Sequence, residues 1–211
     1  MTEITIVGAG SMARGIATRA LGGGHSVIVV HPDAGKRQAL ADELTSLGSV
    51  TTASPQDALG GEVVVLAVPY EAVAGIVDAY GDDLGGRVLV DISNPIDWDT
   101  MQIATPAGTS AAEQTAAAVP AGTHVVKAFN TTFASTLSAG EVAGQAIDVF
   151  IAGDDDDAKG KLAAIVLSGN LRPLDAGTLS RSRELEAMQL IHIKLQSSLG
   201  TGYASALKIL A

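Results

Sequence analysis

The chain contains no cysteine among its 211 residues. A disulfide framework, a thiolate nucleophile and a zinc site with cysteine ligands are therefore excluded. Aromatic residues are also scarce, at 3% of the sequence, whereas hydrophobic residues reach 47% and alanine and glycine are abundant. Small apolar side chains allow helices to pack closely on a sheet, so this composition favours an α/β fold over a sandwich of large side chains.

Basic residues are few, with 13 Lys and Arg against 23 Asp and Glu, for a formal net charge of -10. Such a charge repels phosphate-rich duplexes, so we expect no nucleic-acid partner. No apolar run approaches the roughly 18 residues of a membrane span, and Met1-Thr2-Glu3 lacks the basic start of a secretory signal. We therefore expect no membrane partner and a cytoplasmic location.

Short β-branched runs alternate with helix-like segments along the chain. Continuous apolar runs indicate strands covered on both faces, as in a parallel sheet. Strands are predicted at 4–7, 27–30, 63–68, 88–92, 125–129, 147–151 and 171–174, and helices at 12–21, 34–47, 70–80 and 155–167. The order predicts a Rossmann-type, doubly wound, mostly parallel sheet over 1–177, with a small C-terminal helical segment, 178–211, packed on it.

Three other segments carry separate predictions. Residues 97–120 lack a clear period and suggest a long active-site loop followed by an Ala-rich helix. The run Asp154 to Asp157 suggests either caps at a helix start, which we favour, or a metal site. Residues 180–199 predict an amphipathic helix, because its apolar residues recur at helical spacing: Leu185, Met188, Ile191 and Leu195.

A glycine-rich turn joins the first predicted strand to the first predicted helix. In this context the pattern G-x-G-x-x-G/A indicates a dinucleotide site, so we predict that 1–177 is an NAD(P)-binding domain. Gly8 permits the tight turn, Gly10 lets the backbone approach a pyrophosphate, and small Ala13 allows close helix packing. Ser11 and Met12 supply backbone N–H groups for the phosphates. The alternative is an ordinary glycine-rich turn without a ligand.

The end of the second strand normally selects between NAD and NADP. An acidic residue there bonds the ribose 2′-hydroxyl of NAD, but this chain has His31. Because Lys36 and Arg37 follow closely, we favour NADP over NAD. Two alternatives remain open: Asp33 could turn inward and serve NAD, and the two basic side chains could form a solvated surface.

Two further strand ends point to the same crevice, since ligands of open α/β sheets bind outside the carboxyl ends of the strands. Ala67, Val68 and Pro69 are predicted to pass beside the adenosine and ribose, and Ser93 and Asn94 to hydrogen-bond near the nicotinamide. Ordinary strand-ending turns are the alternative for both segments.

Several segments together resemble the NADPH-dependent coenzyme F420 reductases, a family that also looks related to the cytosolic oxidoreductase domain of the STEAP metalloreductases. The resemblance covers nearly the whole chain and is carried by Gly8 to Ala13, 67–71, 91–95, 125–131 and 171–177, with Ser180 and Arg183. It implies a dimer in which a hydride passes between nicotinamide C4 and C5 of an 8-hydroxy-5-deazaflavin. Such a reaction needs ring positioning and exclusion of water, so no catalytic side chain is assigned.

The resemblance places further residues at the cofactor. His31 and Pro32 stand where the family has Ser-Arg at the 2′-phosphate, with Arg37 as a substitute guanidinium. Asn130 and Thr131 stand near the nicotinamide carboxamide, where the family often has His-Thr. The departures leave two alternatives: a nicotinamide-dependent reductase of another small carbonyl, imine or flavin, and a non-catalytic dinucleotide sensor.

Four basic side chains and a histidine invite other roles. Lys127 is a general-acid candidate, but we expect a lysine at a strand edge reaching solvent. His192 is expected to be packed or interfacial rather than catalytic. A basic patch for the phosphate and polyglutamate tail of a deazaflavin, or simple surface charge, is suggested by Arg172, Arg181 and Arg183.

Overall fold

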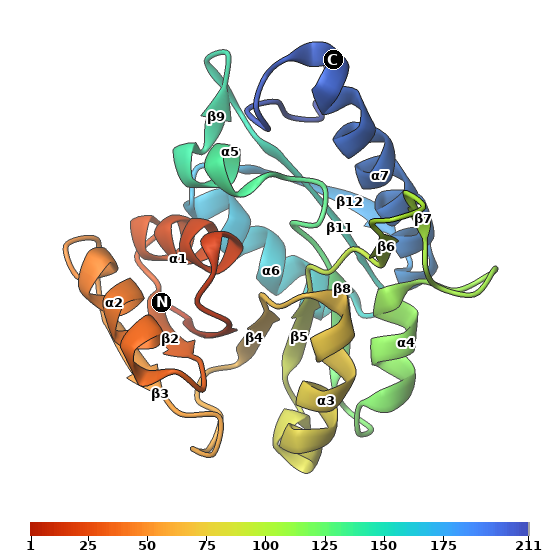
Figure 1. Ribbon diagram of the computed structural model, residues 1–211. Helices are drawn as coiled ribbons and strands as arrows, with labels where there is room; N and C mark the ends of the chain where they lie inside the picture. The colour runs from red at the N-terminus through yellow and green to blue at the C-terminus, as the bar shows by residue number, and fades with distance from the viewer. Residues whose placement is uncertain (211) are drawn as a thin grey trace.

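An eight-stranded sheet runs through the centre of the protein in the computed structural model, which describes residues 1–210 (Figure 1). The strand order is β12-β11-β8-β5-β4-β1-β2-β3. The strands are β1 (Glu3–Val7), β2 (Ser26–Val30), β3 (Val50–Ala53), β4 (Val63–Leu66), β5 (Val88–Asp91), β8 (His124–Lys127), β11 (Asp148–Gly153) and β12 (Arg172–Gly177). From β3 to β8 all pairings are parallel, whereas β11 pairs antiparallel with β8 and parallel with β12. The predicted Rossmann-type, mostly parallel sheet is confirmed.

Helices cover both faces of this sheet (Figure 1). One layer contains α1 (Ser11–Gly22), α2 (Ala34–Leu44), α5 (Ala134–Ala139) and α6 (Asp156–Ser168), and the other contains α3 (Tyr70–Tyr80), the short 3-10 turn η1 (Gly81–Leu84) and α4 (Ala111–Ala118). Successive side chains of β4 alternate between the two cores, with Val63 and Val65 on the α1 side and Val64 and Leu66 on the α3 side. Burial on both faces explains why the strands read as continuous apolar runs.

The sequence prediction missed several short elements. It contained no β3, no α5 and neither of two small hairpins, β6 (Ile96–Asp97) with β7 (Gln102–Ile103) and β9 (Glu141–Val142) with β10 (Gln145–Ala146). The expected long loop at 97–120 therefore holds the β6–β7 hairpin, followed by the expected helix, α4. Two-residue strands leave no periodic pattern, which is why the sequence did not reveal the two hairpins.

The acidic run before α6 acts at the helix start, as predicted. The side chain of Asp155 accepts a hydrogen bond from the Ala158 N–H at 2.8 Å, which is N-cap geometry. Asp154 instead accepts from the Leu179 N–H at 2.9 Å and so ties the start of the C-terminal segment to the domain. The division at residue 177 stays a prediction.

The C-terminal segment comprises the 3-10 turn η2 (Leu179–Arg181) and α7 (Ser182–Leu199). The helix is confirmed, but the side that it buries differs from expectation. Leu185 is buried, whereas Ile191 and Leu195 are 59% and 45% exposed. The buried face is mainly polar: Ser182, Glu186, Gln189, His192 and Gln196. These side chains find hydrogen-bond partners inside the chain, and the C-terminal part of the apolar stripe, Ile191 and Leu195, remains exposed. Within residues 1–210 no helix is both long and apolar enough to cross a membrane.

Candidate functional site

A groove of about 440 Å³ lies where β1 and β4 run side by side in the sheet. The chain leaves β1 into α1 on one face and leaves β4 into α3 on the other, which opens the crevice typical of such a topological switch point. Three predicted segments meet in it, together with four residues that the predicted site did not include: Tyr70, Glu71, Ile92 and Trp98. Its lining is Gly10, Ser11, Met12, Ala67, Val68, Pro69, Tyr70, Glu71, Ile92, Ser93, Asn94 and Trp98.

The two glycines of the turn are required for different reasons. Gly8 has φ +128°, and a Cβ built there would lie 2.2 Å from the carbonyl oxygen of Ala67, so the fold itself excludes a side chain. Gly10 has φ -87°, and a Cβ there would meet no protein atom within 4 Å. Nothing in the polypeptide therefore demands glycine at position 10. The open space beside it suits a ligand that approaches the backbone closely.

The N-terminus of α1 faces the groove with backbone donors. Gly10 is the N-cap residue of α1, and no side chain accepts a hydrogen bond from the first turn of the helix. The first N–H groups of a helix, here those of Ser11, Met12 and Ala13, have no partners within the helix. Ala13 is fully buried, as the close packing of α1 requires. The positive end of the helix dipole and these donors together can hold a pyrophosphate.

The end of β2 adjoins this turn, because the Gly8 N–H donates to Val30 O at 2.8 Å. The guanidinium of Arg37 lies at the same strand end and donates to the carbonyl oxygen of His31 at 2.9 Å. His31 Nδ1 accepts from the Asp33 N–H at 3.0 Å, which leaves Nε2 available as a donor. Pro32 is exposed beside them.

Asp33 does not turn inward as the NAD alternative required. Its carboxylate caps α2 by accepting a hydrogen bond from the Lys36 N–H at 3.1 Å. That hydrogen bond lowers the pKa of Asp33 below its ordinary value, so the side chain is ionised and engaged in capping. The side chain of Lys36 is exposed on the first turn of α2. The strand end thus presents a guanidinium and an imidazole without a free carboxylate.

Two asparagines join the ends of β5 and β8. Asn94 Nδ2 donates to the Asn130 carbonyl oxygen at 2.9 Å, and Asn130 Nδ2 donates to Asn94 Oδ1 at 3.0 Å. Within residues 1–210, two buried polar atoms here have no partner: Asn130 Oδ1 and Thr131 Oγ1. Unpaired buried polar atoms are rare and call for a partner outside the chain. A carboxamide, which both donates and accepts, matches this need, so the residues present fit a nicotinamide.

Lys127 does not reach solvent, so the expectation of a strand-edge lysine is wrong. Its side chain is fully buried at the end of β8. The ammonium lies 3.2 Å from Asp91 Oδ1 and 2.8 Å from Glu186 Oε1, and it donates to the carbonyl oxygen of Ser93 at 2.6 Å. Because the partners come from β5 and α7, the lysine ties the C-terminal helix to the edge of the sheet that forms the groove.

The two buried carboxylates differ in pKa. Burial alone would raise the pKa of Asp91, but the Lys127 ammonium and hydrogen bonds from Ser93 and Thr115 outweigh it and leave this pKa below its ordinary value. Burial raises the pKa of Glu186, an effect that Lys127 and the Ala111 N–H offset only in part. Asp91 is therefore the carboxylate that balances the positive charge of Lys127.

Ser93 is held from two directions by this cluster. Asp91 Oδ1 accepts hydrogen bonds at 2.7 Å from both the backbone N–H and the hydroxyl of Ser93, while Lys127 binds its carbonyl oxygen. The peptide that leads into Asn94 is thereby fixed. A carboxylate within an apolar strand, as at Asp91, was the signal available in the sequence, whereas nothing local marked Glu186 on the C-terminal helix.

His192 and the three arginines of the suggested basic patch have partners within the protein. His192 packs against Phe133 with ring centroids 4.4 Å apart and lies 2.8 Å from Ser205 Oγ, so its packed role is confirmed. The three arginines do not form one patch. Each pairs with its own carboxylate: Arg172 with Asp148, Arg181 with Glu184, and Arg183 with Glu113. The charge that a polyanionic tail would need is already neutralised.

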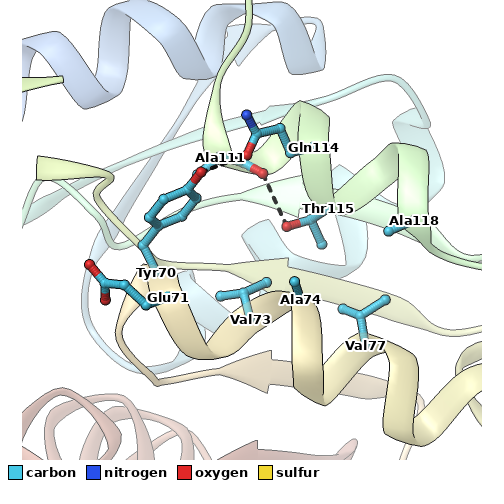
Figure 2. Close-up of a pocket in the computed structure, with 9 residues that line it drawn as sticks. All are labelled: Tyr70, Glu71, Val73, Ala74, Val77, Ala111, Gln114, Thr115 and Ala118. Carbon is cyan, nitrogen blue, oxygen red and sulfur yellow. Dashed lines mark hydrogen bonds between the residues drawn. The ribbon is translucent and has the colours of Figure 1, made fainter. Parts of the chain in front are cut away.

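A second cavity, of about 220 Å³, lies between α3 and α4 (Figure 2). Tyr70 and Glu71 line both this cavity and the groove. In Figure 2 the Tyr70 side chain spans toward α4, where its hydroxyl donates to Gln114 Oε1 at 2.7 Å. The lining is otherwise mostly apolar and offers no cation for a phosphate. The groove remains the candidate site.

The fold and its groove define a Rossmann-type protein, and comparisons with known proteins identify the family. The family described as "NADP oxidoreductase coenzyme F420-dependent" matches residues 3–95. The F420-dependent NADP reductase of Methanothermobacter thermautotrophicus is 30% identical over 208 residues, which cover 92% of this chain and 89% of the relative. The chain belongs to the F420-dependent NADP reductase family, and it is an NADP-dependent oxidoreductase.

Two other comparisons show how much of each chain the similarity covers. Rat metalloreductase STEAP3 is 35% identical over 188 residues, but these cover 89% of this chain and only 36% of STEAP3. A crystal structure of a candidate F420-dependent NADP reductase from Arthrobacter sp. FB24 superposes with a TM-score of 0.87 at 28% identity, with full coverage of both chains. The fold is thus shared throughout, whereas the chain spans about a third of STEAP3.

Proposed function

We propose that this protein transfers a hydride between NADPH and an oxidised 8-hydroxy-5-deazaflavin of the coenzyme F420 type. In that reaction a hydride leaves nicotinamide C4 for deazaflavin C5, and a proton from solvent goes to N1. The observation that carries the proposal is the groove at the switch point, which joins the glycine-rich turn to Asn94. Behind Asn94, its partner Asn130 and the adjacent Thr131 each have an unpaired buried oxygen. Family membership supports the identity of the acceptor.

The chain's own residues are assigned to positioning rather than to proton transfer. The N–H groups of Ser11 and Met12 hold the pyrophosphate, with Gly10 giving it room. The strand ends place the sugar and the ring: Ala67, Val68 and Pro69 beside the adenosine ribose, and Ser93, Asn94, Asn130 and Thr131 around the carboxamide. Holding two rings at transfer distance supplies most of what such a reaction needs.

NADP is assigned over NAD at the end of β2. Arg37 and His31 offer donors to a 2′-phosphate, and Asp33, the carboxylate that would suit a 2′-hydroxyl, is engaged as the cap of α2. Charge-assisted hydrogen bonds from a guanidinium favour the phosphorylated ribose. Lys36, exposed on the same first turn of α2 as Arg37, adds a second cation nearby.

The test is turnover with purified protein. Oxidised deazaflavin is mixed with NADPH or with NADH, and its absorbance is followed as the ring is reduced. We expect rapid bleaching with NADPH and slow bleaching with NADH. Tight NADPH binding by calorimetry without bleaching would contradict the deazaflavin assignment. Turnover with an imine, carbonyl or flavin would then identify another reductase, and no turnover with any of them a sensor.

We also propose that two copies of the chain associate through α7. Its outward stripe of Ile191, Leu195 and Leu199 is exposed, as are Tyr203 and Ile209 in the segment that follows. Exposed apolar stripes of this kind mark association surfaces, and a two-fold dimer is the commonest arrangement. Sedimentation of the wild type should give twice the chain mass, and Ile191→Lys with Leu195→Lys should give the single mass. A monomeric wild type would contradict the proposal.

A further inference from the structure

Trp98 is the only tryptophan of the chain and lies on the wall of the groove. It sits on the β6–β7 hairpin, and its side chain is 65% exposed. The groove places it together with the phosphate turn, Gly10 to Met12, and with Asn94. An exposed indole in a chain with so few aromatic residues is therefore part of the site and not of the core.

The hairpin that carries Trp98 is anchored directly to the site. The Ile96 N–H donates to the carbonyl oxygen of Asn94 at 2.9 Å, and the Ala104 N–H donates to that of Pro95 at 2.7 Å. Across the tryptophan, the carboxylate of Asp97 accepts hydrogen bonds from the Asp99 and Thr100 N–H groups at 2.9 and 3.0 Å. Ile96 is buried beneath. The indole is thus exposed on a defined turn.

The indole has no aromatic neighbour of its own. In the part of the chain that the structure describes, the ring pairs join Phe133 to His192 and to Tyr203, and none includes Trp98. A large apolar ring left in solvent forgoes the burial that would stabilise it. Flat heteroaromatic rings stack on such faces, and the gain depends little on their exact substituents.

We infer that Trp98 is the stacking platform for the planar heteroaromatic ring of the hydride acceptor. The inference rests on the proposed function, because it takes the nicotinamide to lie at Asn94 and Asn130 and puts the acceptor between that ring and the indole. It identifies the acceptor by its chemistry as a flat tricyclic ring, and it disfavours small aliphatic carbonyls and imines.

Because Trp98 is the only tryptophan, the fluorescence of the protein at tryptophan wavelengths reports on this side chain alone. Wild-type protein saturated with NADP⁺ is titrated with oxidised deazaflavin, or with riboflavin as a second flat ring, and tryptophan emission is recorded. Free N-acetyltryptophanamide is titrated in parallel to correct for absorption by the ligand. We expect saturable quenching well beyond that correction. Emission that follows the free amide with both rings would overturn the inference.

Variants give the second readout. Trp98→Ala should raise the KM for the acceptor roughly tenfold, the size expected for one lost aromatic stacking contact, with NADPH affinity changed less than about twofold. Trp98→Phe keeps a flat face and should restore most of the loss. Leu167→Ala removes a side chain of similar exposure, 64%, on α6 and serves as the control.

The outcomes separate this inference from the proposed function. Deazaflavin turnover with an unchanged KM in Trp98→Ala would retain the proposed function and reject the platform. Quenching by riboflavin together with riboflavin turnover, in the absence of deazaflavin turnover, would retain the platform and reject the deazaflavin assignment. Equal losses of NADPH and acceptor affinity in Trp98→Ala would reject the platform, because the indole would then serve the nucleotide.

Discussion

The two ends of the groove present different kinds of polar group: backbone groups at one end and side chains at the other. At the end proposed to bind phosphate, the available donors are backbone N–H groups, in the turn from Gly8 to Ala13 and the first turn of α1. At the end proposed to bind the ring, the polar groups are side chains: the Asn94 and Asn130 pair and the buried Lys127 behind Ser93. A helix N-terminus binds phosphate in any protein that presents one. The orientation of a flat ring needs donors and acceptors in fixed positions, which this chain obtains from buried charges.

The comparison is tested most severely at Lys127. Lys127→Met would leave two carboxylates, Asp91 and Glu186, buried without their shared cation, and we expect a loss of about 3–5 kcal/mol in the free energy of unfolding, measured in denaturant. In the protein that remains folded, NADPH should bind more weakly while 2′,5′-ADP, which lacks the nicotinamide, binds as before.

Lys161 provides the control for that experiment, because its pair with Glu62 lies at the surface. Lys161→Met should leave the unfolding midpoint unchanged. If Lys127→Met weakens NADPH and 2′,5′-ADP by the same factor, the lysine supports the fold as a whole and not the ring end.

The two glycines of the turn allow the phosphate end to be dissected. Gly10→Val should reduce affinity for NADPH by at least about a hundredfold in calorimetry, since its side chain occupies the space left for the pyrophosphate. Its melting temperature should stay near that of the wild type, because a Cβ there meets no protein atom within 4 Å.

Gly8→Ala is the matched opposite. Its Cβ would clash with Ala67 O, at a φ of +128°, so melting temperature should fall. Wild-type affinity in Gly10→Val would refute the proposed phosphate site, and loss of stability in that variant would show that the turn, not the ligand, requires glycine.

Arg37→Ala sharpens the assignment of NADP. The guanidinium donates to the carbonyl oxygen of His31 at the end of β2, where we propose that a 2′-phosphate binds. We expect NADPH affinity to fall about tenfold and NADH affinity to stay within twofold, measured by calorimetry. Arg181→Ala, which removes an arginine paired with Glu184 on α7, should change neither. Equal losses for both nucleotides would contradict the 2′-phosphate role.

The smallest effect, a change in thermal stability, is expected at Asp148, a buried carboxylate outside the groove. Burial alone would raise the pKa of Asp148, but hydrogen bonds from Arg172, Lys208 and the Ile209 N–H outweigh it, so this pKa is lowered overall. Because the folded-state pKa is below the unfolded value of about 3.9, the carboxylate stabilises the protein above that pH and ceases to do so as pH falls through the lower folded value.

Asp148→Asn should accordingly lower the melting temperature at pH 7 by roughly 2–4 °C and make its decline in acid shallower. Hydride transfer at neutral pH should be unchanged, because the residue anchors the C-terminal tail and touches no part of the groove. A loss of NADPH affinity equal to that of Lys127→Met would show that buried charge in general, and not its contact with Ser93, supports nucleotide binding.

The predictability of the site follows the same division. The turn from Gly8 to Ala13, His31 and Arg37 were predicted from spacing, and the structure places them beside one another at the ends of β1 and β2. Their role toward a ligand stays a prediction. The partners of Lys127 were not found, since Asp91, Glu186 and the lysine lie on three elements far apart in the sequence. Trp98 was missed because the β6–β7 hairpin has no periodic signal.

The sequence by itself determined the alternation of strands and helices, the turn that opens α1, and the fold class, because each depends on short-range pattern and on steric rules of the backbone. Only the tertiary structure decided which face of α7 is buried, which carboxylates surround Lys127, and which side chains close the groove beside Asn94. These depend on the free energy of burying charge and polar atoms, which is set by partners that no local pattern specifies.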